Sequence, residues 1–534
     1  MTDRFPALDL VDELDGAGRL DRREFIGLLG ATLAACGGNT GPVDVRQGSG
    51  RPPSAPTIAA DPFQLGVASG DPLSDGAILW TRLAPRPHQG GGMPDERVPV
   101  VWEVSPRPEF GTLVGSGWTY ARPELGHSVH VDVRGLQPDT WYWYRFRIGD
   151  QWVSPAGRTR TLPRAGSSPD LLRIGTASCQ NYAHGYYPAH AHLAEENLDL
   201  VFFLGDYIYE SGWNQGIREH PSGRPVTLDD FRNRYGLYKS DPNLRAAHAQ
   251  CPWIATWDDH EVSNNYANLE PEHPDSYDRP FEEVRAAAYQ AYYEHLPLRV
   301  PFPDDPNDLQ IFRRFQWGDL VDVHVLDGRQ YRSDQACMGE VGPPCDAVDD
   351  PDRTMLGDRQ IAWLKEGLSD STARWQAIAQ QTVFSPITFG NAVINPDQWD
   401  GYAAERQELL ESFGQATDGN LTVLTGDIHS GGFTTLHRND DDSSSPRVGW
   451  EIVTTSISSS GAERLQKARD ILVRTLDHIE YFNPGERGYT VVEYRPDGCT
   501  ARYRTVETVK RRESAISTRA VFEMDAGGGH RRLG

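Results

Sequence analysis

The sequence has no excess of positive charge, little cysteine and no apolar run long enough to span a bilayer as a mature helix. Its 534 residues include six cysteines and carry a formal net charge of −24. Such an acidic chain lacks the basic surface that broad nucleic-acid binding needs, which argues against that class of function. The same charge repels anionic substrates, so any phosphate site needs its own local cations, and bound metal ions would supply them.

The N-terminal region carries the features of an export signal. Arg22 and Arg23 precede an apolar run at residues 25–35, whose length suits a signal peptide. Residues 21–26 resemble the twin-arginine motif, and residues 33–36 resemble a lipobox that ends in Cys36. We predict a signal peptide at residues 1–36 and export by the twin-arginine machinery to the periplasm, cell envelope or exterior, with lipid anchoring at Cys36 as one option. The alternative is an amphipathic helix with a chance arginine pair.

The other cysteines divide into three kinds. Cys337 and Cys345 flank a Gly-Pro-Pro loop and could form a short surface disulfide in an oxidising envelope. Cys251 and Cys499 have no obvious partner and are expected to be small buried apolar residues. Cys179 is assigned to the functional site.

The first part of the folded chain has a β pattern. After a linker rich in Gly, Pro and Ser at residues 37–57, strands are predicted at residues 77–82, 98–104, 127–133 and 141–148. Residues 135–144 look like the tyrosine corner of fibronectin-III-like sandwiches. We predict a small β-sandwich domain at residues 58–163.

From residue 170 onward, short apolar runs alternate with helical stretches. Strands are predicted at residues 171–176, 198–204, 253–257, 321–326, 375–380, 421–425 and 451–455. Helices are predicted at residues 188–197, 281–295, 358–368, 405–413 and 462–476. This alternation favours an α/β catalytic domain with a buried sheet at residues 170–505, followed by a C-terminal tail at residues 506–534.

Side chains of the kinds that bind metals follow four of these strands. In chain order they are Cys179, then Asp206 and Tyr209, then Asp258, Asp259 and His260, and last Asp427 and His429. In an α/β sheet, ligands bind at the carboxyl ends of the strands, so the four loops can converge on one crevice.

Each of these residues taken alone has an ordinary structural explanation. An Asp after a strand is more often a helix cap or a turn former, and a buried Cys is usually inert. Four strand ends that all carry such residues are a much stronger signal than any one of them. We therefore favour a metal centre.

Three motifs resemble the calcineurin-like metallophosphoesterases: Gly-Asp206-x-x-Tyr209, Asp259-His260-Glu261 and Gly426-x-x-His429. Cys179, the run from Asp258 to Asn265, the Asp-x-Arg-Gln-Tyr run at residues 327–331 and the Asp427 motif are similar to one branch, the PhoD-type alkaline phosphatases and phosphodiesterases. The similarity extends from about residue 63 to about residue 494. This sequence has Cys179 where Asp-x-His is usual and Asp427 where His is usual, which casts doubt on two ordinary divalent transition metals.

The resemblance implies a centre that combines Fe³⁺ with one or more Ca²⁺ ions. Cys179, Tyr209 and His429 would bind iron, Asp206 would bridge the metals, and Asp259, Asn265 and Asp427 would bind calcium. Two choices stay open, between Asp258 and Asp259 and between Asn264 and Asn265. Thiolate and phenolate groups suit a trivalent metal, whereas carboxylate and amide oxygens suit calcium.

The resemblance also implies roles at the substrate. His260 would face the leaving group or the phosphate, and Asn265 would contact the substrate. Arg329 could reach the phosphate, although an Arg at a strand end more often pairs with an acid. Asn181 could orient the phosphate or cap the next helix.

We predict an exported, monomeric phosphomonoesterase or phosphodiesterase for small phosphate esters. The resemblance implies a four-layer α/β/β/α catalytic domain beside the sandwich. Phospholipase D-like action on phospholipids is the alternative within this class, and a non-catalytic surface-binding lipoprotein is the alternative outside it. No nucleic-acid partner is expected, except as a substrate.

Overall fold

The computed structural model describes residues 50–212, 216–389, 392–393, 395–440, 442–461 and 469–533. The predicted signal peptide, the lipobox Cys36 and residues 37–49 of the predicted linker lie outside these residues. None of the helices in the described ranges is long and apolar enough to cross a membrane.

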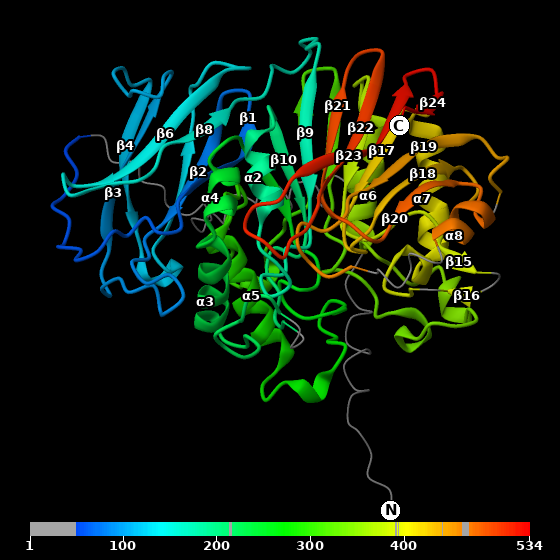
Figure 1. Ribbon diagram of the computed structural model, residues 1–534, viewed down its shortest axis with the longest axis horizontal. Coiled ribbons are helices and arrows are strands. Elements are labelled where there is room, and N and C mark those ends of the chain that lie inside the picture. The colour runs from blue at the N-terminus through cyan, green and yellow to red at the C-terminus, as the bar shows by residue number, and fades with distance from the viewer. Residues whose placement is uncertain are drawn as a thin grey trace, which may run out of the picture. The chain divides into compact units, whose positions relative to one another are not determined.

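Two mixed β-sheets form the centre of the described structure (Figure 1). The larger has ten strands, in the order β24 (His530–Arg532), β23 (Ile516–Asp525), β22 (Gly498–Val506), β21 (Arg487–Tyr494), β9 (Leu172–Ala177), β10 (Leu200–Leu204), β11 (Trp253–Thr256), β1 (Val67–Leu73), β2 (Gly76–Arg82) and β5 (Ser128–Val133). The other has seven strands, in the order β12 (Arg313–Trp317), β13 (Val321–Val325), β14 (Trp375–Ala379), β17 (Leu421–Thr425), β19 (Arg447–Val453), β18 (Gly431–His437) and β20 (Ile479–Asn483).

The main hydrophobic core lies between these two sheets. Ile174 and Phe202 of the larger sheet belong to the same buried cluster as Val323, Trp375 and Trp450 of the smaller one. Strands β9, β10 and β11 are parallel, as are β13, β14, β17 and β19. Parallel strands covered on both faces read as continuous apolar runs, which is why the sequence pattern located them.

Helices pack on the outer faces of both sheets. The helices are α2 (Pro188–Glu195), α3 (Leu228–Lys239), α4 (Pro242–His248), α5 (Phe281–His295), α6 (Asp358–Ser369), α7 (Ala403–Ala416) and α8 (Arg469–Thr475). His190 of α2 stacks near Phe203, whose side chain points away from the core that contains Phe202. Leu364 of α6 and Leu409 of α7 share a second cluster with Val423 of the smaller sheet.

The N-terminal β region forms a sandwich that shares strands with the larger sheet. Its own sheet contains β4 (Gly115–Ala121), β3 (Val98–Ser105), β6 (Trp141–Ile148), β7 (Trp152–Val153) and β8 (Gly157–Arg160). Val100 and Tyr144 of that sheet pack against Leu79 and Val131 of β2 and β5. Gly70 of β1 pairs in parallel with Trp253 of β11. Strands β1, β2 and β5 of the sandwich therefore continue the larger sheet of the α/β part. Gly70 and Trp253 are far apart in the sequence, so their pairing leaves no local sequence pattern.

The segment predicted as a tyrosine corner closes on itself. The backbone N–H of Gln137 donates to the Tyr142 hydroxyl at 2.9 Å. Tyr142 is buried in the sandwich core, so this bond ties the turn before β6 to the strand.

The C-terminal residues contradict the predicted tail, because they form two strands. Ala520, Phe522 and Met524 of β23 alternate with more exposed residues and are buried against the main core. The Phe522 ring stacks on Phe433 of the smaller sheet at 4.0 Å. The period-two pattern was visible in the sequence. Of the predicted helix at residues 462–476, the structure describes residues 469–476, which include α8, and the rest lies outside the described residues.

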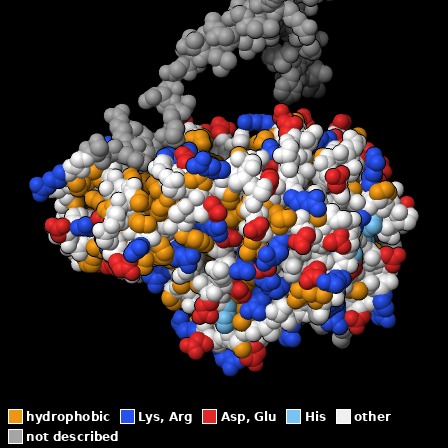
Figure 2. All heavy atoms as spheres, turned by 90° about the horizontal axis from the view of Figure 1, so that it is seen from above, with side chains coloured by type: hydrophobic (Ala, Val, Ile, Leu, Met, Phe, Trp, Pro, Cys, Tyr) orange, Lys and Arg blue, Asp and Glu red, His pale blue; other side chains and the backbone are white. Residues whose placement is uncertain are grey.

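Charges of both signs are interspersed on the surface. Figure 2 shows one face on which acidic and basic side chains alternate, while apolar side chains gather over the N-terminal sandwich. Leu113, Val114 and Val153 of that sandwich are exposed. Cys337 and Cys345 form a disulfide, whereas Cys179, Cys251 and Cys499 are buried and free.

Lys239, the last residue of α3, has a buried amino group. Its Nζ donates to the Tyr207 hydroxyl at 3.2 Å and lies 4.2 Å from the centre of the Trp80 ring. The described residues offer it no carboxylate within ion-pair distance. Burial lowers the pKa of Lys239 well below its ordinary value. The unfolded chain would keep this proton up to about pH 10.4, so stability rises with pH between the lowered pKa and that value.

Replacing Lys239 with methionine is expected to remove this pH dependence. Relative to the native chain, the free energy of unfolding of Lys239→Met should rise less steeply toward alkaline pH, by up to about 1.4 kcal/mol per pH unit. Urea unfolding at several pH values from about 7 to about 10 measures the two slopes. Lys510→Met, at an exposed lysine, is the control. If the free energy of unfolding changed equally with pH in the native and Lys239→Met chains, an uncharged Lys239 in the folded state would be contradicted.

Candidate metal centre

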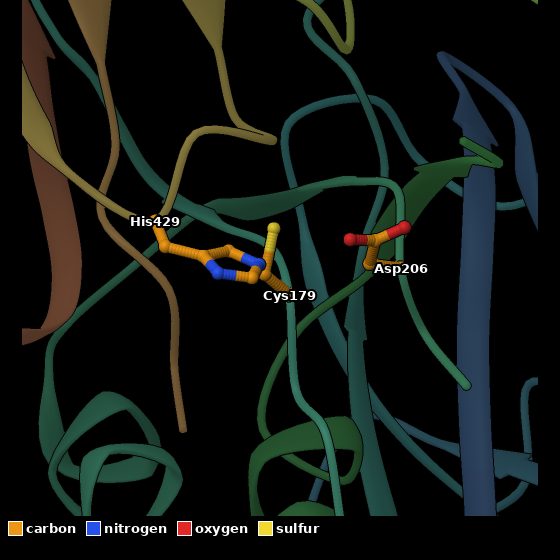
Figure 3. Close-up of side chains that lie close together, drawn as sticks. All are labelled: Cys179, Asp206 and His429. Atoms are coloured by element: carbon orange, nitrogen blue, oxygen red, sulfur yellow. The ribbon is translucent and has the colours of Figure 1, made fainter. Parts of the chain in front are cut away.

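The predicted ligands come together where strands of both sheets end. Cys179 follows β9, Asp206 follows β10 and His260 follows β11, all in the ten-stranded sheet. Asp427 and His429 follow β17, which belongs to the seven-stranded sheet. The four loops carry ligand atoms that lie close together, but the fourth loop comes from the facing sheet. Figure 3 shows Cys179, Asp206 and His429 close together.

Several of these residues have left-handed backbone conformations. The φ angles are 57° at Cys179, 59° at Asp206, 51° at Asn265, 61° at Asp427 and 53° at His429. A non-glycine residue in this region costs on the order of 1 kcal/mol or more. Such strain gathers at functional sites, where it turns side chains toward a common point.

One group of ligand atoms contains sulfur, nitrogen and oxygen. The ligand atoms of Cys179, Asp206 and His429 lie within 4.8 Å of one another. The Tyr209 hydroxyl donates to Asp206 Oδ2 at 2.7 Å, lies 3.0 Å from His429 Nε2 and accepts from Ser459 Oγ at 2.8 Å. His429 Nδ1 lies 2.6 Å from the Ser460 carbonyl oxygen, so Nδ1 carries the proton and Nε2 is free to bind a cation.

Two further groups contain mainly carboxylates. Asp206, Asp258 and Asp427 form one, and Asp206, Asp259 and His260 form the other. Asp206 is common to all three groups, as expected of a bridging ligand. Asp258 Oδ2 and Asp259 Oδ1 are buried and have no hydrogen-bond partner among the described residues. A buried carboxylate oxygen without a partner is costly unless a cation binds it.

Electrostatics shows that this cluster fits a cation. Burial, together with neighbouring carboxylates, raises the pKa of Asp206 and of Asp427 well above the usual range, and the pKa of Asp258 to about 7. Burial and the charges of Asp206 and Asp427 also raise the pKa of the Cys179 thiol. Metal ions of high charge would reverse these shifts and hold the groups deprotonated. The donor set therefore fits a site for metal.

Glu261 joins the two loops that carry most of the carboxylates. Its carboxylate accepts from the backbone N–H groups of Asp206 at 3.1 Å, Tyr207 at 2.5 Å and Asp258 at 2.8 Å. Glu261 is the last residue of the Asp259-His260-Glu261 motif, but no role was predicted for it. Its position directly after His260 was the available signal.

His260 lies beside the cluster and is held by Glu210. The distance from His260 Nδ1 to Glu210 Oε2 is 2.7 Å, and the imidazole stacks on the Tyr209 ring at 4.1 Å. Burial opposes protonation, but Asp259 and Glu210 outweigh it and raise the pKa of His260 well above its ordinary value. The neighbouring carboxylates therefore favour the protonated form of His260.

Arg329 lies behind the carboxylates, and its side chain is fully buried. Its Nε donates to Asp258 Oδ1 at 2.6 Å, and its two Nη groups donate to the Asp397 carboxylate, each at 2.8 Å. All three nitrogens are engaged by carboxylates. This does not support the expected contact with phosphate, because the guanidinium is occupied by these charge-assisted bonds.

The two predicted substrate-binding amides differ in their surroundings. Asn181 is fully buried, and its Oδ1 accepts from the N–H of Ala183 at 2.9 Å while its Nδ2 donates to the Ser211 carbonyl at 3.3 Å. Asn265 is half-buried, and its N–H donates to Asp259 Oδ2 at 2.7 Å. Its Nδ2 donates to Glu272 at 3.1 Å. The polar atoms of Asn181 are thus engaged by the backbone of Ala183 and Ser211, whereas Asn265 is only half-buried.

Two residues near the site carried no sequence signal. Asp397 binds Arg329, and the side-chain amide of Gln398 donates to Asp427 Oδ2. Both residues are buried. They lie outside every motif and reach the centre only through the tertiary fold.

Two family models match most of the chain. Residues 174–503 match the family model PhoD-like phosphatase, and residues 49–163 match its N-terminal domain. Alkaline phosphatase D from Bacillus subtilis (strain 168) is 46% identical over 520 residues, which cover 94% of this chain and 87% of that protein.

Solved structures give the same result. A structure of PhoD matches with a TM-score of 0.85 and 45% identity, covering 90% of this chain and 94% of that one. A purple acid phosphatase from yellow lupin matches with a TM-score of 0.51, 12% identity and coverage of 85% and 74%, which is a likeness of fold alone. The chain belongs to the PhoD-like phosphatase family.

Proposed function

We propose that this chain is an exported enzyme that hydrolyses phosphate esters at a centre of Fe³⁺ and Ca²⁺. As a PhoD-like phosphatase it is a metal-dependent phosphoric ester hydrolase. The observation that carries the metal assignment is the buried cluster around Asp206, in which carboxylates, a thiol, a phenol and an imidazole share one point. Only cations can offset that much negative charge in a buried site.

The donor chemistry divides the cluster into two sides. Cys179, Tyr209 and the neutral Nε2 of His429 suit a ferric ion, with Asp206 as the bridge. Asp427, Asn265 and Asp259 supply hard oxygens that suit calcium. The grouping of Asp258 with Asp206 and Asp427 supports Asp258 as a further calcium ligand, through its unpaired Oδ2. Bound metals would orient the phosphate, offset its charge and activate an oxygen nucleophile.

The chain's own residues would orient the ester and move the proton. His260, kept protonated by Glu210 and Asp259, would donate to the leaving oxygen. Asn265 would hold the phosphate from the open side. Arg329 would act by positioning Asp258, and Asn181 by shaping the Cys179 loop, because their polar atoms are already engaged.

The remaining proposals concern architecture and location. Helices α2 to α5 beside the larger sheet and α6 and α7 on the smaller one support a four-layer α/β/β/α arrangement. The Gln137–Tyr142 bond supports a fibronectin-like sandwich. The Cys337–Cys345 disulfide supports export to an oxidising compartment, by the twin-arginine route and with or without a lipid anchor at Cys36.

An ester panel tests this function directly. Purified protein should hydrolyse a phosphate monoester or a small phosphodiester, contain iron, and lose activity when a chelator removes calcium. A phospholipid in the same panel separates phospholipase action from action on small esters. A protein with no turnover of any of these esters would contradict the proposal.

A further inference from the structure

We propose that a brace positions the carboxylates of the metal centre from outside the ligand set. The brace comprises two segments. One is residues 335–345, which include the loop that the Cys337–Cys345 disulfide closes, and the other is Val393 with residues 395–398. Its positioning residues are Gln335 and Gln398. The proposal rests on the proposed function, because it assumes that Asp258, Asp259 and Asp427 hold metal.

The first contact of the brace comes from Gln335. Its Nε2 donates to the Asn265 carbonyl oxygen and, at 2.8 Å, to Asp397 Oδ1. The N–H of Asn265 in turn donates to Asp259 Oδ2 at 2.7 Å. One side-chain amide therefore joins the loop of Asp259 to the acid that binds Arg329.

The second contact comes from two consecutive buried residues. Asp397 receives both Nη groups of Arg329, whose Nε holds Asp258. Gln398 donates to Asp427 Oδ2, and its Oε1 accepts from the N–H of Val383. Residues 397 and 398 thus reach carboxylates that follow strands of two different sheets.

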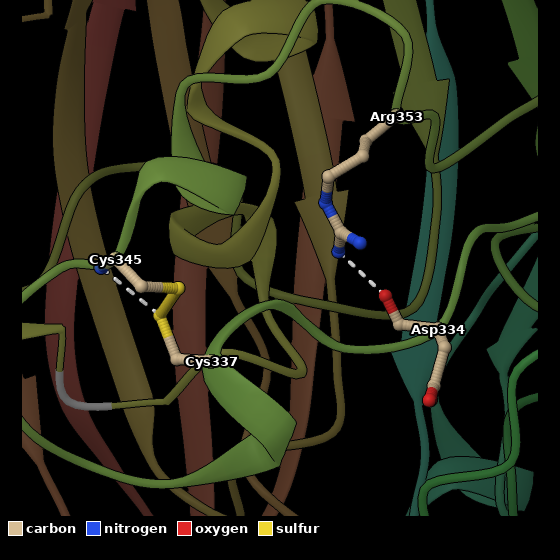
Figure 4. Close-up of a disulfide and its surroundings, with 4 residues drawn as sticks. All are labelled: Asp334, Cys337, Cys345 and Arg353. Atoms are coloured by element: carbon tan, nitrogen blue, oxygen red, sulfur yellow. Dashed lines mark hydrogen bonds between the residues drawn. A yellow bond between two sulfur atoms is a disulfide. The ribbon is translucent and has the colours of Figure 1, made fainter.

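The disulfide loop holds this segment in place. Gly342 and Val393 exchange backbone hydrogen bonds of 2.8 and 3.1 Å. Ala336, Val348 and Val393 form a small buried cluster with the two cysteines. Arg353 donates to the Asp334 carbonyl oxygen beside Gln335 (Figure 4). The Cys337–Cys345 bond lies two residues beyond Gln335 and limits how far that side chain can withdraw.

Calcium affinity depends on how rigidly its oxygen ligands are held. Loss of a hydrogen-bond partner behind a metal ligand typically costs about 10- to 100-fold in metal affinity. Gln398 would fix the direction of Asp427, and Gln335 would fix the backbone of Asn265, whose N–H holds the Asp259 carboxylate. Neither residue is needed to supply a donor atom to the metal.

The test measures calcium binding and turnover on the full chain. Gln398→Leu and Gln335→Leu are each expected to weaken calcium binding in calorimetric titration by about tenfold or more. Raising the calcium concentration should restore part of the lost kcat, which a general loss of folding would not allow. Gln407→Leu is the matched control, because Gln407 is a half-buried glutamine of α7 that bonds the Arg438 carbonyl and none of the predicted ligands, and it should titrate like the native chain.

A double variant protects the test against misfolding at the site. Cys337→Ser with Cys345→Ser leaves every residue that contacts the carboxylates unchanged and should weaken calcium binding in the same direction. The brace would be overturned if both glutamine variants and the cysteine double variant bound calcium with native affinity. Ester hydrolysis by the native chain would then still support the proposed function. If the native chain hydrolyses esters without binding calcium, the calcium assignment fails. The kcat of the glutamine variants then decides the brace, since an unchanged kcat overturns it.

Discussion

Asp206→Asn is expected to abolish hydrolysis of every phosphate ester that the native enzyme cleaves. Asp206 is the residue shared by all three candidate metal groups. Its carboxylate also accepts a hydrogen bond of 2.7 Å from the Tyr209 hydroxyl. The substitution keeps the size of the side chain but removes its charge. Because metals supply several kcal/mol of charge stabilisation, we expect kcat/KM to fall by at least about a thousandfold. Steady-state kinetics and metal analysis of the same sample measure the effect.

The control for this substitution is Asp418→Asn. Asp418 is exposed in the turn before β17, at the other end of that strand from Asp427. It should keep native kinetics and native metal content. Unchanged ester hydrolysis in Asp206→Asn would contradict the metal centre itself and would revive a non-catalytic binding function for this protein.

Cys179→Ser is expected to remove iron and activity while leaving the fold intact. Cys179 lies in a left-handed conformation within 4.8 Å of Asp206 and His429, and burial raises the pKa of its free thiol. A serine hydroxyl is far harder to deprotonate, so it would not replace a thiolate on a ferric ion. We expect the visible charge-transfer absorption to disappear and kcat to fall at least about a hundredfold, by analogy with other lost transition-state interactions.

Cys251→Ser is the matched control, since Cys251 is also a free, buried cysteine. It removes a buried thiol without touching the centre, so it should lower stability by only about 1–3 kcal/mol and keep iron, colour and turnover. Absorption spectra, iron content and kinetics compare the three proteins. A colourless, iron-free native enzyme with full activity would contradict the iron assignment, whatever the variants do.

Local sequence patterns predicted much of the fold because they report burial along single elements. The helix predicted at residues 281–295 has the bounds of α5, and the strand predicted at residues 421–425 has those of β17. Buried parallel strands and amphipathic helices leave such patterns in their own residues. The missed strand β23 had a period-two pattern too, but it follows the end of the family resemblance.

The sequence by itself identified side chains that gather at the candidate metal centre. Ligand-type side chains at four strand ends already identified Cys179, Asp206 and His429 as partners, and the family comparison confirms the enzyme class. The tertiary structure alone decided that β17 approaches from the facing sheet, that Arg329 lies behind the site, and that Asp397 and Gln398 support it. Strand order and contacts between segments distant in the chain arise from packing of the two sheets, and no local pattern encodes them.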